Sequence, residues 1–135
     1  DGPPPEINLS NEKNNGLIVL RLINNKLVSS VHDISSGGLL VALAEMTYKS
    51  GHGLRIDKPK NLSNLMEYYF SEDQGRYLIE IEPKNLGVIS KILNENNIFN
   101  EAIGTVQKDY FEISGEFKIT TNDLYKINNT WYNNY

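Results

Sequence analysis

The spacing of apolar residues along this chain changes between intervals of three or four and intervals of two. The wider intervals place apolar side chains on one face of a helix, whereas alternation places them on one face of a strand. The sequence therefore predicts helices over residues 11–27, 37–49, 62–69 and 83–93, and strands over residues 28–34, 54–57, 77–81, 101–107, 110–114 and 116–119. Thr120 and Asp123 have the spacing of a capping pair, which predicts a last helix after residue 120.

Two of these helices have well-defined apolar faces in the sequence. We expect Ser10 to cap the first helix. Its expected buried face consists of Leu17, Leu20, Ile23 or Asn24, and Leu27. In the second helix the expected buried residues are Leu39, Leu43 and Met46. Because the helices alternate with strands that are not neighbours along the chain, and the strands end in a hairpin, we predict an α+β fold in which helices cover a sheet.

Composition narrows the class of protein. The 135 residues suffice for one domain, and residues 1–10, with three consecutive prolines, predict an extended tail or interdomain linker before a single domain over residues 11–135. A start on Asp-Gly-Pro-Pro-Pro suggests a piece of something longer. The net charge of −4 without a basic stripe argues against nucleic acid and membrane partners. The absence of cysteine excludes thiolate zinc sites, and two histidines alone do not supply a zinc site.

The segment from Val31 to Leu39 is the most informative stretch, because two adjacent glycines stand between a predicted strand and a predicted helix. Free backbone N–H groups at such a helix start can hold a phosphate, with Asp33 beside it as a Mg²⁺ ligand. Alternatively, the segment is a tight turn in which Ser35 or Ser36 caps the helix and Asp33 braces the loop. The bare pattern favours the tight turn, since the Lys-Ser/Thr pair of a full phosphate loop is missing.

A second polar cluster, Glu72-Asp73-Gln74-Gly75-Arg76, precedes the strand predicted at residue 77. Its two carboxylates, amide and guanidinium could bind hydroxyl groups, a metal or a phosphate. Taken alone, such a charged turn is more simply a solvated loop.

Together these segments resemble one family. Residues 30–46 are similar to the signature His-Asp-x-Ser-x-Gly-Gly-Leu-x-Val-Ala-Leu-Ala-Glu-Met in the last domain of phosphoribosylformylglycinamidine synthase. Residues 70–77 resemble its Phe-x-Glu-Ser-Gln-x-Arg-Phe/Tyr segment, with Asp73 where serine is usual, and residues 103–106 match its Ile-Gly-x-Val strand. Spacing and order agree from about residue 10 to residue 131.

The resemblance implies an α/β/α-layered mixed sheet, as in the C-terminal domain of aminoimidazole ribonucleotide synthase. It also implies part of a cytoplasmic ligase that uses ATP, Mg²⁺ and glutamine-derived ammonia to convert formylglycinamide ribonucleotide to formylglycinamidine ribonucleotide in purine biosynthesis. The family's catalytic histidine, Mg²⁺ ligands and most ATP contacts lie in N-terminal domains that this chain lacks. We therefore expect no catalytic residue, no metal site and no bound cofactor in the chain alone.

The partners that the resemblance implies are those missing domains of the same chain, a glutaminase subunit or domain, and a small accessory subunit. The resemblance suggests Glu72, Asp73 and Gln74 for binding substrate or nucleotide. With the candidates from the segment around the two glycines, the full set is Asp33, Ser35, Gly37, Gly38, Glu72, Asp73 and Gln74.

Two alternatives stay open at this point. The chain could belong to a relative with a different reaction, such as hydrogenase maturation or aminoimidazole ribonucleotide synthase, which have similar Gly-Gly helix starts. It could also be a non-catalytic assembly module whose apolar edges pack on neighbouring domains.

Overall fold

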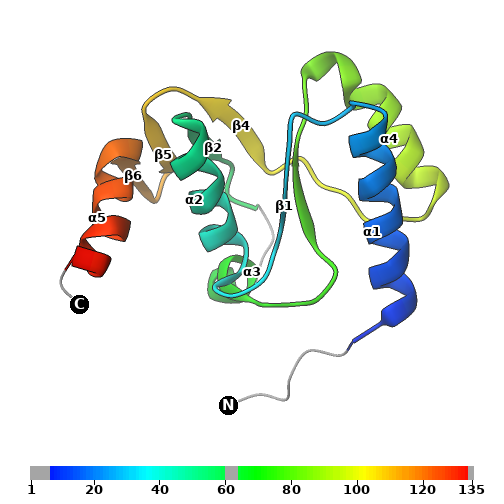
Figure 1. Cartoon of the computed structure of the whole chain (residues 1–135), viewed down its shortest axis with the longest axis horizontal. Coiled ribbons are helices and arrows are strands. Elements are labelled where there is room, and N and C mark those ends of the chain that lie inside the picture. Colours follow the sequence, from blue (N-terminus) through cyan, green and yellow to red (C-terminus); the bar gives the residue numbers. More distant parts are fainter. Residues whose placement is uncertain (1–6, 60–63, 134–135) are drawn as a thin grey trace. The chain divides into compact units, whose positions relative to one another are not determined.

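The computed structural model of the chain describes residues 7–59 and 64–133 (Figure 1). The described residues form two compact units, one from residues 7–42 and 69–101 and the other from residues 43–59, 64–68 and 102–133. The division falls inside two helices, α2 (Gly38–Ser50) and α3 (Leu65–Phe70). Most of the predicted tail, residues 1–6, lies outside the described residues.

The elements follow the predicted order with small shifts at their ends. In the described residues the other helices are α1 (Leu9–Asn24), η1 (a 3₁₀ turn, Pro83–Asn85), α4 (Leu86–Glu95) and α5 (Thr121–Asn133). The strands are β1 (Ser30–Asp33), β2 (Gly53–Ile56), β3 (Tyr77–Glu80), β4 (Gly104–Gln107), β5 (Tyr110–Ile113) and β6 (Phe117–Thr120). This mixture of helices and strands confirms the predicted α+β class.

In the first unit, α1 packs against α4 (Figure 1). The buried centre of this contact consists of Ile18 and Leu22 from α1 with Ile89 and Leu93 from α4. Each pair is four residues apart, so both side chains lie on the same face of their helix. Surrounding this centre are the partly buried residues Leu27, Val28, Ile79, Ile81, Ile92 and Ile98.

The predicted buried face of α1 is wrong for Leu17, Leu20 and Ile23, whereas Leu27 is partly buried beside the core. Leu17, Leu20 and Ile23 are 55%, 52% and 45% exposed, whereas Ile18 and Leu22 are buried. Residues 17–23 are apolar at every position except Arg21, so the helix has two apolar stripes and its sequence does not show which stripe faces the core.

The predicted cap of α1 is also wrong. The helix begins at Leu9, and the side chain of Asn8, not that of Ser10, accepts a hydrogen bond of 3.0 Å from the Asn11 N–H. Both residue types cap helices well, and the apolar pattern alone did not fix the first turn.

The first unit also contains a two-stranded antiparallel sheet formed by β1 and β3. Its register pairs Ser30 with Glu80 at one end and Asp33 with Tyr77 at the other. This register matters for the site. Residues 34–38, which we call the glycine turn, follow Asp33, and residues 71–76, which we call the acidic turn, precede Tyr77.

The second unit contains a four-stranded mixed sheet in the order β4-β2-β5-β6. Strand β2 pairs antiparallel with β4 and parallel with β5, and β5 forms a hairpin with β6. Ile56, Phe111 and Ile113 are buried on one face, as expected for strands in which every second residue points to the core. The predicted mixed sheet is thus present, and in the described residues the two strands of the first unit form a sheet of their own.

The last helix starts as the sequence predicts. The Thr120 hydroxyl accepts a hydrogen bond from the Asp123 N–H at 3.0 Å and donates one to the Asp123 carboxylate at 2.7 Å. Among the described helices, none combines the length and apolar character required to cross a lipid bilayer.

Candidate functional site

The pairing of β1 with β3 brings together two polar segments that are far apart in the sequence. Because the strands are antiparallel, the end of β1 lies beside the start of β3. A further backbone hydrogen bond, from the Ile34 N–H to the Arg76 carbonyl at 2.9 Å, continues this pairing past the strand ends. The glycine turn and the acidic turn therefore leave the same end of the sheet.

The glycine turn has the backbone conformation that its two glycines permit. Gly37 and Gly38 have φ values of +81° and +70°, a region that residues with a Cβ atom rarely adopt. The Gly38 N–H donates to the Ser35 carbonyl at 3.0 Å, which closes a tight turn before α2. A Cβ atom on Gly38 would lie 2.7 Å from the Phe70 Cα, so the lack of a side chain also allows close backbone packing.

The Gly37 N–H is capped by an acidic side chain from the other turn. It donates a hydrogen bond of 2.7 Å to Oε1 of Glu72, a residue 35 positions away. A carboxylate at this point is favoured both by the N–H groups at a helix start and by the helix dipole. At Gly37 the capping group is thus Glu72 of the other turn, while a cap from Ser35 or Ser36 on the later N–H groups of α2 stays a prediction.

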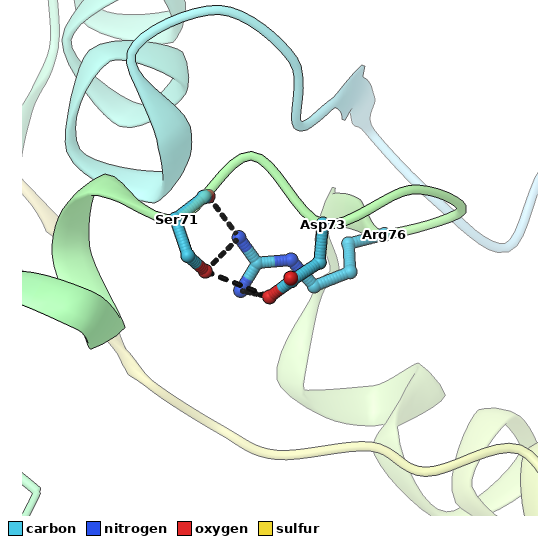
Figure 2. A network of polar contacts seen from close by, with 3 residues as sticks. All are labelled: Ser71, Asp73 and Arg76. Carbon is cyan, nitrogen blue, oxygen red and sulfur yellow. Dashed lines mark hydrogen bonds and ion pairs between the residues drawn. The ribbon is translucent and has the colours of Figure 1, made fainter. Parts of the chain in front are cut away.

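Three further residues of the acidic turn form a polar network (Figure 2). Nη2 of Arg76 donates to the Ser71 carbonyl at 2.6 Å and lies 3.3 Å from the Ser71 hydroxyl oxygen. The Ser71 hydroxyl donates to Oδ2 of Asp73 at 2.7 Å, and that oxygen is 4.0 Å from Nη1 of Arg76. Arg76 thereby closes a loop that begins five residues earlier, at Ser71, and Glu72 is one of the residues between them.

Helix α1 supports the same loop from another side. The Asn15 side-chain amide donates to the Gly75 carbonyl at 2.9 Å. Gly75 has a φ of +71°, and a Cβ atom there would lie 3.3 Å from the Glu12 Cα. The loop is therefore fixed by its own arginine and by a helix that lies 60 residues earlier in the sequence.

Five of the predicted site residues take part in the contacts described above, and the other two, Asp33 and Gln74, are exposed. Gly37 and Glu72 contact each other directly, while Gly38 and Ser35 shape the turn and Asp73 belongs to the Arg76 network. Asp33 ends β1 with a side chain that is 67% exposed, and Gln74 is exposed in its turn. The supporting roles of Ser71 and Asn15 were missed, and no feature of the sequence distinguishes Asn15 from the chain's many other asparagines.

The carboxylates of the site can also be compared with what a metal ion needs. Across the described ranges, no three Asp, Glu or His side chains are grouped so that they could hold a metal ion. The Glu72 carboxylate is engaged with a backbone N–H. What the arrangement offers chemically is a partly exposed edge with carboxylate, amide and hydroxyl groups in fixed positions.

Most of the chain matches one known protein family. The chain matches the family described as AIR synthase related protein, C-terminal domain, over residues 4–114. It is 46% identical over 135 residues to phosphoribosylformylglycinamidine synthase subunit PurL of Pelagibacter ubique, covering all of this chain and 18% of that protein. The same subunit of Bartonella bacilliformis is 40% identical over 131 residues, covering 97% of this chain and 18% of that protein. The chain thus spans under a fifth of the length of these relatives.

Solved structures share the fold. Thermotoga maritima PurL complexed with FGAR superposes with a TM-score of 0.73 at 20% sequence identity, covering 84% of this chain and 21% of that one. The same protein complexed with ATP gives a TM-score of 0.72 at 19% identity with the same coverage. The resemblance seen in the sequence motifs is confirmed, and the chain belongs to the family of AIR synthase related proteins, as a C-terminal domain of that family.

Proposed function

We propose that this chain is the C-terminal domain of a phosphoribosylformylglycinamidine synthase. The intact protein would be a ligase that converts formylglycinamide ribonucleotide to formylglycinamidine ribonucleotide with ATP and glutamine-derived ammonia. The observation that supports this most is the identity of 46% along the entire chain, which includes both turns that meet at the site. Within this proposal, residues 1–10 are a tail or linker and residues 11–135 a single domain with no activity of its own.

In the proposed enzyme, the edge formed by the two turns faces the substrate or a nucleotide. Gly37 and Gly38 fix the start of α2, and Glu72, Asp73 and Gln74 present oxygen and amide groups beside it. Asp33 and Ser35 complete this edge from the β1 side. When bound, ATP would supply the phosphoryl group that activates the amide oxygen. Its Mg²⁺ would need ligands from elsewhere in the longer protein.

The proposed partners are the remaining domains of a longer chain, a glutaminase and a small accessory subunit. The relatives are more than five times as long as this chain, and one structural neighbour is described as PurLQS from Thermotoga maritima. We place the proposed enzyme in the cytoplasm, where purine synthesis takes place.

Genetic complementation tests this proposal. The complete reading frame that contains this chain is expressed in a bacterial strain that lacks the synthase and needs added purine. We expect growth without purine, and the purified protein should consume ATP only when formylglycinamide ribonucleotide and ammonia are both present. A well-expressed protein that neither restores growth nor shows this ATP consumption would contradict the proposal.

One observation favours a second role, assembly. Leu17, Leu20 and Ile23 form an exposed apolar stripe on α1, opposite the stripe that packs on α4. Apolar side chains grouped in this way are typical of contact surfaces, and a neighbouring domain of the longer protein would cover them. Leu17→Glu with Leu20→Lys should then reduce the yield of soluble full-length protein, whereas Glu101→Gln, in an exposed loop, should leave it unchanged.

A further inference from the structure

Arg76 connects the two halves of the candidate site. Its guanidinium closes the loop from residue 71 to residue 76, and its backbone carbonyl accepts the Ile34 N–H at the start of the glycine turn. Glu72 lies between these two anchor points and caps Gly37. A single residue thus holds both the loop that carries the carboxylate and the backbone that leads to its hydrogen-bond donor.

The guanidinium is well suited to this task. One of its terminal nitrogens reaches both the carbonyl and the hydroxyl oxygen of Ser71, and the other faces Asp73. Within the described residues its Nε atom is buried and has no hydrogen-bond acceptor, so the side chain is held through its terminal nitrogens alone. A planar group with several donors can satisfy this arrangement, whereas a lysine ammonium is a single point charge.

Asp73 takes part in the same loop network. Its carboxylate accepts a hydrogen bond from Ser71 and lies 4.0 Å from Arg76, with a side chain that is 55% exposed. Glu72 is thereby left as the carboxylate of this loop that reaches the start of α2.

We propose that Arg76 is a positioning residue. Its guanidinium holds the acidic turn so that the Glu72 carboxylate stays hydrogen-bonded to the Gly37 N–H and fixes the start of α2. Arg76 acts through Glu72 and not through its own charge on a ligand. Without the Arg76 guanidinium, the Glu72 carboxylate is no longer held at the Gly37 N–H. Without Glu72, a change at Arg76 no longer affects the glycine turn. The kinetic part of this inference rests on the proposed function, whereas the part that concerns the backbone does not.

A double-mutant cycle in the full-length protein tests this dependence. The variants are Arg76→Lys, Glu72→Ala and the two together, with Arg21→Lys, an exposed arginine on α1, as the matched control. Hydrogen exchange is measured by mass spectrometry on a peptide that contains the amide of Gly37. We expect about tenfold faster exchange in each single variant, the scale of one charged hydrogen bond, and no further increase in the double variant. The control should exchange like the parent.

Steady-state kinetics supply a second readout. Arg76→Lys should raise KM for the ribonucleotide about three- to tenfold, on the scale of one weakened hydrogen bond. Its kcat should change less than twofold, and in the Glu72→Ala background the same substitution should change neither constant. If Arg76 acted by its charge, the lysine would preserve KM.

The outcomes separate this inference from the proposed function. Effects of the two substitutions that multiply in the double variant, in exchange or in KM, would overturn the positioning role. Coupled exchange in a protein without synthase turnover would instead uphold the positioning role and contradict the proposed function.

Discussion

The Gly37 N–H and the Glu72 carboxylate form a hydrogen bond of 2.7 Å across 35 residues of sequence. The backbone just before α2 is therefore held by a residue from the other turn, in addition to the turn that Ser35 closes with Gly38. Because the end of β1 lies beside the start of β3, the two turns adjoin and each supports the conformation of the other. Loss of this hydrogen bond should consequently change the conformation of both turns.

Loss of the Glu72 cap should weaken α2. We expect Glu72→Ala to reduce the free energy of unfolding by about 0.5–2 kcal/mol, the usual cost of removing a capping side chain. Urea unfolding followed by circular dichroism measures this change. Glu101→Ala, in an exposed loop, provides the control and should change the free energy by less than about 0.5 kcal/mol. Equal effects of the two substitutions would contradict the cap.

Two glycines with positive φ allow strain to be separated from crowding. Gly51 has a φ of +69° with open space around it, and Gly38 has a φ of +70° with the Phe70 backbone close by. Gly51→Ala should cost about 1–2 kcal/mol from backbone strain alone. Gly38→Ala should cost about 1–3 kcal/mol more, because its Cβ atom would overlap Phe70. Similar unfolding midpoints for the two variants would show that the backbone yields at Gly38.

Gly87 and Gly53 should respond in opposite directions. Gly87 lies exposed in α4, and no atom outside its own helix turn lies within 4 Å of where a methyl group would stand, so Gly87→Ala should stabilise the protein by about 0.5–1 kcal/mol. A Cβ atom on Gly53 would collide with the Tyr110 carbonyl in the neighbouring strand, so Gly53→Ala should destabilise it. Thermal unfolding of both variants checks the signs, and a stabilising Gly53→Ala would refute the close approach of β2 and β5.

The two possible caps of α1 can be distinguished directly. Asn8→Ala should reduce the free energy of unfolding by about 1 kcal/mol, because Asn8 accepts a hydrogen bond from the Asn11 N–H. Ser10→Ala removes the cap that the sequence suggested and should have almost no effect, since Ser10 is an exposed residue inside the helix. The reverse ranking of the two variants would place the helix start two residues later.

Tyr48 should make stability depend on pH in alkaline solution. Burial, and secondarily the nearby charge of Glu45, raises the pKa of the Tyr48 hydroxyl above its usual value. The folded state therefore retains the proton in a pH range where the unfolded state loses it, so stability is complete below pH of about 10 and falls as the pH rises further. Tyr48→Phe should reduce this slope, whereas Tyr125→Phe, its edge-to-face neighbour, should retain it.

Much of the fold followed from the sequence because local signals agreed with long-range ones. Thr120 with Asp123 predicted the start of α5, and alternation in residues 77–81 predicted β3. The buried stripe of α1 could not be predicted, since apolar residues occupy both sides of that helix and only packing on α4 distinguishes them. At the site, the glycines and Glu72 were identified as candidates. Their hydrogen bond was not, because the register of β1 and β3 creates it.

The central position of β2 has a consequence for synthesis on the ribosome. Its neighbours β4 and β5 are encoded about 50 residues later, so at ordinary translation speeds of about 5–20 residues per second they emerge roughly 3–10 seconds after it. During that interval Leu54 and Ile56 lack both strands that will flank them. The nascent chain therefore passes through a stage in which its future central strand is accessible to chaperones, and this stage ends only when residues 104–113 have emerged.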